Sequence, residues 1–302
     1  MANKSAKEHQ NASRPTKGTS PGGRMQLPAP KYLVTADGHK YSVQLPDGEA
    51  IGPLKSVTAI LDIRAKPALI GWAAREASAF FKAELLRLGS RAMTPDMLEQ
   101  IAKDAAGAHR RKAKDAADLG TACHGAFEAI VKGREPEDYP KELEEPVSAF
   151  KTYRLQSDIE VVATELAVAS AKHRAGGRLD FLGWSKNRGG WGIGDYKTAS
   201  GWFGNDFAYQ AGGGYGLMVE EMYGIEIKWA EIVRFSKKPP YESEARPVLD
   251  IRAAMDGFLE ALAMVRRDET PLIGPPTFQS AGKPETPKAA TKKGKADLPM
   301  GF

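Results

Sequence analysis

Two aspartates and a lysine fall within one short region of the chain. Two β-rich runs flank a polar turn there, which predicts a β-hairpin. If the turn is centred between Asn187 and Arg188, Asp180 lies opposite Asp195 across the hairpin. Because side chains alternate between the two faces of a strand, Lys197 shares the face of Asp195. We therefore expect two carboxylates and one ammonium group to converge.

Carboxylates that face each other across a hairpin are destabilising unless a cation neutralises them. Oxygen ligands of this kind suit Mg²⁺ or Mn²⁺, which keep several waters and bind substrate phosphate at the remaining positions. An amine that is partly buried beside a metal has a lowered pKa, so Lys197 could orient or help deprotonate a metal-bound water. The pattern indicates a hydrolytic phosphodiesterase site. The competing interpretation is an exposed ion pair between Asp180 and Lys197, worth about 0–1 kcal/mol.

Upstream residues add two further candidates. Glu165 lies in the otherwise apolar run 161–168, where an unpaired carboxylate is unfavourable, so it either meets a cation or lies at a strand edge. His124 and Glu128 are four residues apart on one face of a predicted helix. Glu128 could hold the imidazole so that its other nitrogen faces a metal. Alternatively, His124 is an ordinary core or surface residue.

Taken in order, these residues resemble the RecB-type exonuclease branch of the PD-(D/E)xK nuclease superfamily, in particular its bacteriophage members. The resemblance covers about residues 55–265. It rests on six segments, namely Ser56–Leu61, Lys66–Ala74, Gly120-Thr-x-x-His124, Glu165, Gly177-Arg-Leu-Asp180 and Asp195-Tyr-Lys197.

The resemblance implies roles for these residues. His124, Asp180 and Asp195 would bind Mg²⁺ or Mn²⁺, Lys197 would serve catalysis, and Glu165 would act in a supporting catalytic role. It also implies a restriction-endonuclease-like α/β core, in which a mixed central sheet is flanked by helices and preceded by a helical block.

A later helix carries Gln210 and Tyr215 as candidate substrate-binding residues. The family pattern has three residues between the glutamine and the tyrosine, whereas this chain has four. On a regular helix the two side chains would be about 140° apart. A bulge or a late helix start at Gly212–Gly214 could restore their alignment, and these glycines would let a phosphate backbone approach. Alternatively, Tyr215 is a core residue.

Three aromatic residues follow the predicted hairpin. Trp202, Phe203 and Phe207 could stack on or wedge a terminal base, a contact worth roughly 1–3 kcal/mol per base. The alternative is that they pack in the core.

The elements that must position these residues follow from residue patterning. We expect a hairpin over 32–43, a helical block over 66–155, strands at 161–169, 178–184, 191–197 and 228–236, and helices at 207–223 and 249–267. This order predicts an α/β or α+β fold, in which a helical block leads into a mainly antiparallel sheet with a helix between its later strands.

Composition limits the class of protein. The chain has 302 residues, of which 42% are hydrophobic and 27% charged, as in ordinary soluble proteins. It has neither a membrane-length apolar run nor a signal-peptide core, so we expect a cytoplasmic protein, in a bacterial host if the protein is phage-encoded. The single cysteine, Cys123, excludes an intramolecular disulfide and a four-cysteine cluster.

The net charge of +5 comes from the two ends of the chain. Residues 1–28 and 275–302 are rich in lysine, proline, serine and glycine, and we expect both to be disordered basic tails. Residues 29–274 would then form one nuclease domain whose bulk composition gives no evidence of a basic surface.

Together these observations predict a metal-dependent DNA exonuclease in phage recombination, replication or repair. Its partner would be DNA, bound at an end, and a recombination or single-strand-binding protein is a further candidate partner. Two alternatives stay open: a non-catalytic DNA-binding or recombination scaffold, and an endonuclease or junction resolvase on the same core.

Overall fold

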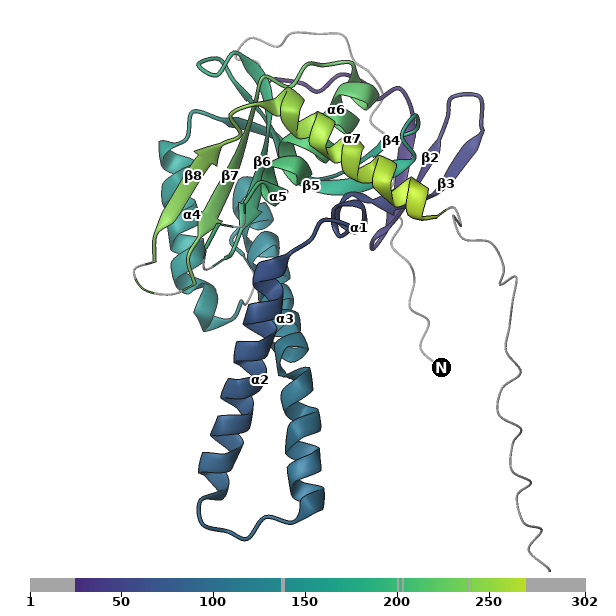
Figure 1. Cartoon of the computed structure of the whole chain (residues 1–302). Coiled ribbons are helices and arrows are strands. Elements are labelled where there is room, and N and C mark those ends of the chain that lie inside the picture. Colours follow the sequence, from purple (N-terminus) through teal and green to yellow (C-terminus); the bar gives the residue numbers. More distant parts are fainter. Residues whose placement is uncertain are drawn as a thin grey trace, which may run out of the picture.

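The computed structural model describes residues 25–136, 139–199, 201–202, 204–237, 239 and 241–269 (Figure 1). The strands within these residues are β1 (Leu33–Asp37), β2 (Lys40–Gln44), β3 (Ala50–Ser56), β4 (Glu160–Ser170), β5 (Ala175–Ser185), β6 (Gly190–Lys197), β7 (Trp229–Phe235) and β8 (Ser243–Pro247). The helices are α1 (Val57–Leu61), α2 (Pro67–Leu88), α3 (Pro95–Val131), α4 (Glu144–Gln156), α5 (Asp206–Ala208), α6 (Gly216–Tyr223) and α7 (Ile251–Asp268), with a 3₁₀ turn η1 (Lys141–Leu143) and a π-helix η2 (Tyr209–Tyr215).

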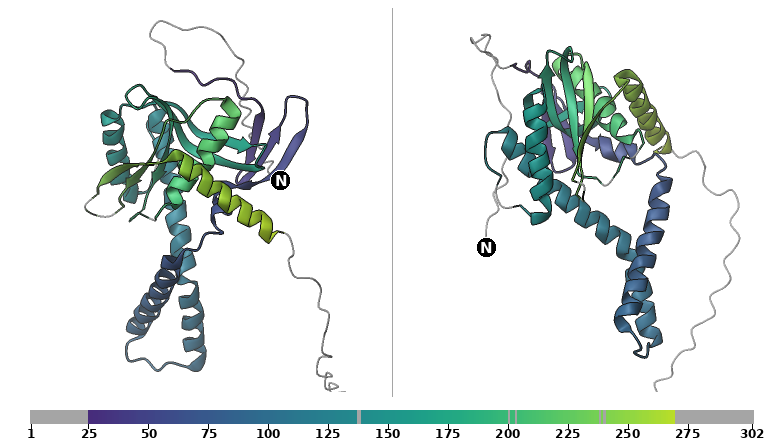
Figure 2. Two further views of the ribbon diagram at one scale, coloured as in Figure 1. Left: turned by 45° about the horizontal axis from the view of Figure 1, so that its top comes forward. Right: turned by 90° about the vertical axis from the view of Figure 1, so that its left-hand side faces the viewer.

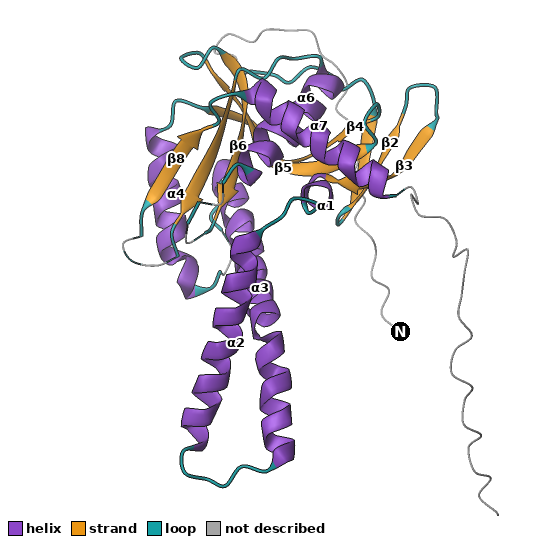
Figure 3. Ribbon diagram, in the orientation of Figure 1, coloured by secondary structure: helices purple, strands orange, loops and turns teal. Residues whose placement is uncertain are grey.

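The strands form one mixed sheet in the order β1-β2-β3-β5-β6-β7-β8, and β4 pairs with β5 (Figure 3). The β3–β5 and β6–β7 pairs are parallel, and the other pairs are antiparallel. The predicted α/β class is therefore confirmed, as is the mainly antiparallel character of the sheet.

Two strands were not expected from the sequence. β3 contains Gly52-Pro53, and both residue types are unfavourable inside a strand. β8 is a short, largely exposed edge strand with the sequence Ser-Glu-Ala-Arg-Pro. Charged residues and proline on an edge oppose pairing with another chain, and they also remove the hydrophobic alternation that identifies a strand.

One edge of β5 is shared by two strands. At its start, Gly176 pairs with Ser56 of β3, and from Phe181 onward the strand pairs with β6. Along this edge, residues 177–180 of β5 lie between the segment that pairs with β3 and the segment that pairs with β6. Asp180 thus lies at a fork in the sheet, where backbone groups need partners other than a neighbouring strand.

Helices cover both faces of the sheet (Figure 2). On one face, α4 and the end of α3 enclose an aromatic core in which the rings of Phe127 and Phe150 stack with centroids 4.0 Å apart. On the other face, α1, η2, α6 and α7 enclose a larger apolar core that includes Phe258 and Met218. The end of α3 is therefore packed firmly against the sheet.

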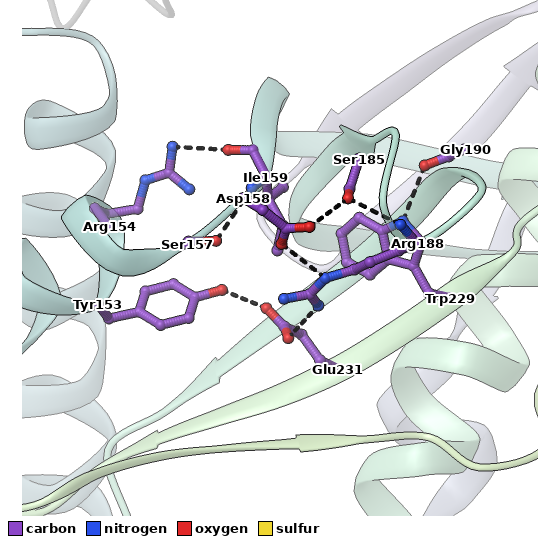
Figure 4. Close-up of polar contacts among 10 residues, drawn as sticks. All are labelled: Tyr153, Arg154, Ser157, Asp158, Ile159, Ser185, Arg188, Gly190, Trp229 and Glu231. Carbon is purple, nitrogen blue, oxygen red and sulfur yellow. Dashed lines mark hydrogen bonds and ion pairs between the residues drawn. The ribbon is translucent and has the colours of Figure 1, made fainter.

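A partly buried polar network links the β5–β6 turn to α4 (Figure 4). The Arg188 guanidinium donates to Glu231 (2.6 Å) and to Asp158 (3.0 Å), and Tyr153 also donates to Glu231. Ser185 donates to Asp158 (2.7 Å). Glu231 is only 4% exposed, and its ion pair with Arg188 satisfies the buried carboxylate. The network holds the turn, and hence the register of the hairpin, in place.

The helices α2 and α3 project from the sheet as a long hairpin (Figures 1 and 2). α3 begins after Thr94, whose side chain accepts from the Met97 N–H, and has proline as its first residue. It has 37 residues, which corresponds to about 55 Å. One continuous helix therefore runs from the tip of the projection to the sheet.

The structure describes part of the expected N-terminal tail. The Met25 N–H donates to Glu160 at 2.9 Å, so residues 25–28 run along the domain instead of being separate from it. Residues 1–24 and 275–302 lie outside the described residues. Within the described part of the chain, no helix is long and apolar enough to cross a bilayer.

Candidate metal centre

The β5–β6 hairpin has the predicted register. Leu182 pairs with Ile193 and Trp184 with Trp191. The ladder ends at Phe181 and Gly194, one position before the two aspartates. At that point the Tyr196 N–H donates to Asp180 Oδ2 at 2.6 Å, so the carboxylate takes the place of a strand partner.

The carbonyl of Tyr196 orients His124. Nε2 of His124 lies 3.0 Å from the Tyr196 oxygen, which can only accept, so the hydrogen is on Nε2. Nδ1 then faces Asp180 Oδ1 at 3.3 Å and Glu165 Oε1 at 3.6 Å. A backbone carbonyl that holds one imidazole nitrogen and leaves the other for a metal is the usual arrangement around a histidine ligand.

This contact corrects the role expected for Glu128. Its carboxylate pairs with Lys132 one turn further along α3, although the residue lines the same pocket as His124. His124 and Glu128 share a helix face, as predicted. The Glu128 carboxylate, however, forms an i, i+4 ion pair with Lys132 and does not hold the imidazole.

Glu165 reaches the site through an unusual backbone conformation. It lies between the pairs Thr164–Phe181 and Leu166–Leu179, and hence opposite Asp180. Its φ of 49° is in the left-handed region, which costs a non-glycine residue on the order of 1–3 kcal/mol. Ala163 and Leu166 pack against the same core although they are three residues apart, so the strand switches faces here. The switch directs Glu165 toward Asp180 and His124.

The structure thus brings His124, Glu165 and Asp180 into one group. One ligand atom from each lies within 4.8 Å of the others. The pocket around them is lined by His124, Phe127, Glu128, Val131, Thr164, Glu165, Asp180 and Tyr196. One imidazole nitrogen and two carboxylates form a donor set suited to a divalent cation such as Mn²⁺ or Mg²⁺.

The electrostatics of this group favour a positive charge beside Asp180. Burial lowers the pKa of His124, but the carboxylates of Asp180 and Glu165 outweigh it and raise that pKa to about 10. Burial disfavours the charged form of Asp180, yet His124 and Lys197 hold its pKa below the usual value. The Asp180 carboxylate is therefore charged and needs positive charge beside it, which a proton on His124 or a metal ion can provide.

Asp195 lies beside this group but is not one of the three. It is 1% exposed, and burial is the main cause that raises its pKa to about 6. Lys197 Nζ lies 2.6 Å from Asp195 Oδ2 and compensates the charge. Oδ1 of Asp195 is buried and has no hydrogen-bond partner among the described residues. A buried carboxylate oxygen without a partner is consistent with the expectation that Asp195 is a metal ligand.

The pKa of Lys197 differs in direction from the sequence-based expectation. Burial lowers it, but Asp195 and Asp180 raise it by more, so the net shift is upward. This upward shift favours the ammonium form of the side chain, which can donate hydrogen bonds. Spacing alone placed the lysine beside two carboxylates, and their combined charge decides the sign of the shift.

The π-helix η2 restores the alignment of Gln210 and Tyr215. Residues five apart are stacked in a π-helix, and Gln210 Nε2 donates to the Tyr215 hydroxyl at 3.1 Å. Tyr215 is 4% exposed, and its ring lies where a Cβ on Gly177 would be, 2.5 Å from Cε1. Tyr215 is therefore packed in the core, as the alternative interpretation expected.

The three glycines of η2 serve packing, which corrects their expected role. All three are buried. A Cβ on Gly213 would lie 2.4 Å from the Ala254 carbonyl oxygen of α7, and one on Gly214 would lie 2.8 Å from Val57 of α1. The missing side chains let helices approach each other, and they leave no path for a phosphate backbone.

The aromatic residues after the hairpin are engaged within the protein. Trp202 donates to Glu244 at 2.8 Å, and the Arg246 guanidinium lies 4.2 Å from its ring centroid. Phe207 lies beneath Lys197, with Nζ 5.1 Å from the ring centroid. Both are half-buried against the core, as the alternative interpretation expected. Phe203 lies outside the described residues.

The role of the Tyr196 backbone in holding Asp180 and His124 was not predicted from the sequence. Its N–H and carbonyl hold Asp180 and His124, but backbone groups leave no trace in residue type. The available signal was positional, because Tyr196 stands between Asp195 and Lys197. The left-handed conformation of Glu165 had no signal either, since glycine, asparagine or aspartate would be the usual residue there.

The chain was compared with family models, curated proteins and solved structures, and a similarity was found among the solved structures. No protein-family model matches the sequence, and no curated protein matches it. Among solved structures, an alkaline exonuclease from Laribacter hongkongensis is similar at 12% identity and a TM-score of 0.26, over 50% of this chain and 84% of that chain.

Proposed function

We propose that this chain is a Mg²⁺- or Mn²⁺-dependent deoxyribonuclease that hydrolyses phosphodiester bonds from DNA ends. The observation that carries the proposal is the double use of the Tyr196 backbone. Its N–H binds Asp180 and its carbonyl binds His124, so a nitrogen and a carboxylate oxygen face the same point beside Glu165. The motif order that resembles RecB-type exonucleases supports DNA as the substrate and an end as the point of attack.

Each residue has a distinct task in this proposal. His124, Glu165 and Asp180 hold the cation, and Asp195 adds a further carboxylate. A bound Mg²⁺ or Mn²⁺ supplies Lewis-acid stabilisation of the phosphate and acidifies water. The Lys197 ammonium donates to the attacking water or to a phosphate oxygen. The water oxygen bonds to phosphorus, the bond to the leaving ester oxygen breaks, and a water proton passes through solvent to that oxygen.

The test compares the purified full chain with two variants on end-labelled linear duplex and covalently closed circular DNA, in Mg²⁺, Mn²⁺ or EDTA. Asp180→Asn keeps an acceptor for the Tyr196 N–H but removes a ligand charge. We expect it to lose on the order of 100-fold or more in rate, since even outer-shell changes cost 10–100-fold. The matched control is Asp118→Asn. Asp118 is an exposed carboxylate on α3 that pairs with Lys114, and we expect this variant to keep full activity.

Each outcome decides between the candidate functions. Metal-dependent loss of linear DNA alone supports the exonuclease. Cutting of circles at a similar rate replaces it with an endonuclease or junction resolvase. Folded protein that binds DNA but cleaves neither substrate is the recombination scaffold, and the enzyme proposal is then wrong.

A further inference from the structure

The helical arm, defined as α2, residues 89–94 and α3 up to Asp118, buries very little of its own surface. Of the 22 residues of α2, Leu88 alone is buried, and residues 89–100 are all exposed. Six of the eleven large apolar side chains that are exposed in the described residues lie on the arm, namely Leu69, Ile70, Leu86, Met93, Met97 and Leu98. An exposed apolar surface of this kind usually marks an interaction site.

The two helices of the arm leave an open groove between them. It has a volume of about 500 Å³ and is lined mostly by apolar and small side chains, namely Ala77, Ser78, Phe81, Lys82, Leu85, Ala102, Ala105 and Ala106. Two helices alone cannot enclose an apolar core, whereas four can. The groove and the exposed side chains beside it are what one half of a four-helix bundle would present.

Charge along α3 indicates which partner completes the bundle. The tip of the helix, residues 95–104, carries three acidic residues and Lys103, a net charge of −2, and its middle, residues 110–118, carries four basic residues with Asp115 and Asp118, a net charge of +2. In an antiparallel pair of identical helices, the acidic tip of each copy lies beside the basic middle of the other. A surface that is complementary to itself in this way is the requirement for a two-fold symmetric interface.

The charges nearest the groove fit this arrangement. Glu99 and Arg110 are eleven residues apart, about three turns, so they lie on one face of α3. Ala102 and Ala106 are exposed on the same face between them and would let a second helix approach closely. Lys112 pairs with Glu76 and Lys114 with Asp118, whereas Glu99 and Arg110 make no ion pair with any described residue.

We propose that the arm is a dimerisation element, which pairs antiparallel with the arm of a second copy of this chain. Glu99 of each protomer then faces Arg110 of its partner, and Leu86 and Leu98 become buried. The proposal is independent of the nuclease proposal, because it concerns a surface outside the metal centre and needs neither metal nor DNA.

The test is sedimentation equilibrium of the full chain in EDTA without DNA. We expect a dimer that Leu86→Glu and Leu98→Glu each convert to monomer, since each places a charge in the apolar interface. Leu249→Glu is the matched control, because Leu249 is 94% exposed and lies outside the arm. It stays dimeric. Circular dichroism verifies that every variant is folded.

A charge exchange tests the antiparallel register. Glu99→Arg and Arg110→Glu each weaken the dimer by roughly 5- to 30-fold, because two symmetric ion pairs become like-charge contacts. The double variant restores the wild-type dissociation constant. A double variant weaker than either single one overturns the register.

Two further outcomes overturn the proposal as a whole. One is a wild type that is monomeric at every concentration, and the other is a dimer that Leu86→Glu and Leu98→Glu leave intact. If Arg110→Glu lowers affinity for DNA while the oligomeric state stays unchanged, the arm is a DNA contact instead. None of these measurements of oligomeric state and DNA affinity depends on cleavage activity.

Discussion

Tyr196 positions the candidate metal centre through its backbone, and its side chain serves another purpose. The ring packs in the aromatic core beside Phe127 and Phe150. Its hydroxyl is buried and has no hydrogen-bond partner among the described residues. A buried, unsatisfied hydroxyl is destabilising by about 1–3 kcal/mol.

We therefore expect Tyr196→Phe to keep the metal centre intact and to raise the free energy of unfolding by about 1 kcal/mol. The variant retains both backbone contacts and the ring. Urea unfolding, together with the DNA cleavage assay, tests this. Loss of cleavage in a stable variant would mean that the hydroxyl takes part in the chemistry.

Metal binding should stabilise the folded chain through the same residues. At a Mn²⁺ concentration of 100 times the dissociation constant, the free energy of unfolding rises by about 2.7 kcal/mol. Asp180→Asn abolishes most of this increase because it removes a charged ligand. Thermal unfolding in Mn²⁺ and in EDTA measures the difference, and an equal rise in Tm for both proteins would place the ion elsewhere.

The buried ion pair of Asp195 and Lys197 should contribute to the stability of the folded chain. Lys197→Met leaves an uncompensated carboxylate that is 1% exposed, so we expect a loss of about 3–5 kcal/mol in the free energy of unfolding. Asp195→Asn/Lys197→Met removes both charges and recovers most of that loss. Urea titration compares the two. If the single variant is as stable as the double, solvent or another group compensates Asp195.

At the scale of elements, the π-helix η2 is what allows four residues between Gln210 and Tyr215. Its extra residue per turn stacks the two side chains, and its buried glycines let α7 and α1 pack against it. The same turn of helix therefore serves both a candidate substrate-binding pair and the core.

Gly213→Ala tests that packing. The new Cβ would lie 2.4 Å from a backbone oxygen of α7, which cannot rotate away, so we expect a loss of about 1–3 kcal/mol. Gly125→Ala on α3 is the contrast, because no atom lies within 4 Å of its Cβ, and it should stabilise by up to about 1 kcal/mol. Two variants of equal stability would mean that η2 moves without penalty.

At the scale of the whole molecule, the sheet and the arm differ in how well they are packed. The hairpin turn at Arg188 is held by Glu231 and Asp158, whereas the residues of the arm tip around Arg91 are exposed. We expect trypsin to cut after Arg91 well before Arg188, and dimerisation through the arms to slow that cut as protein concentration rises. Mass spectrometry of timed digests follows both sites. A rate at Arg91 that is independent of concentration would contradict a protected arm.

The sequence by itself determined most of the elements, without β3 and β8, and part of the site. Helix-forming residue types and helix-start signals at Pro67 and Pro95 identify α2 and α3, and a two-residue period identifies β4, β5 and β6. The register of the β5–β6 hairpin could be derived from its turn, because pairing in a hairpin is local. Residue spacing was therefore enough to place Asp180, Asp195 and Lys197 near one another.

Tertiary structure alone decided how those residues are used. The fork at β5 frees the backbone of Tyr196, and that backbone orients His124 from a helix 72 residues away in sequence. The left-handed Glu165 and the net charge around Lys197 likewise depend on contacts between distant segments. Local propensity carries no information about such contacts, since they arise from packing and from charges that only the folded chain brings together.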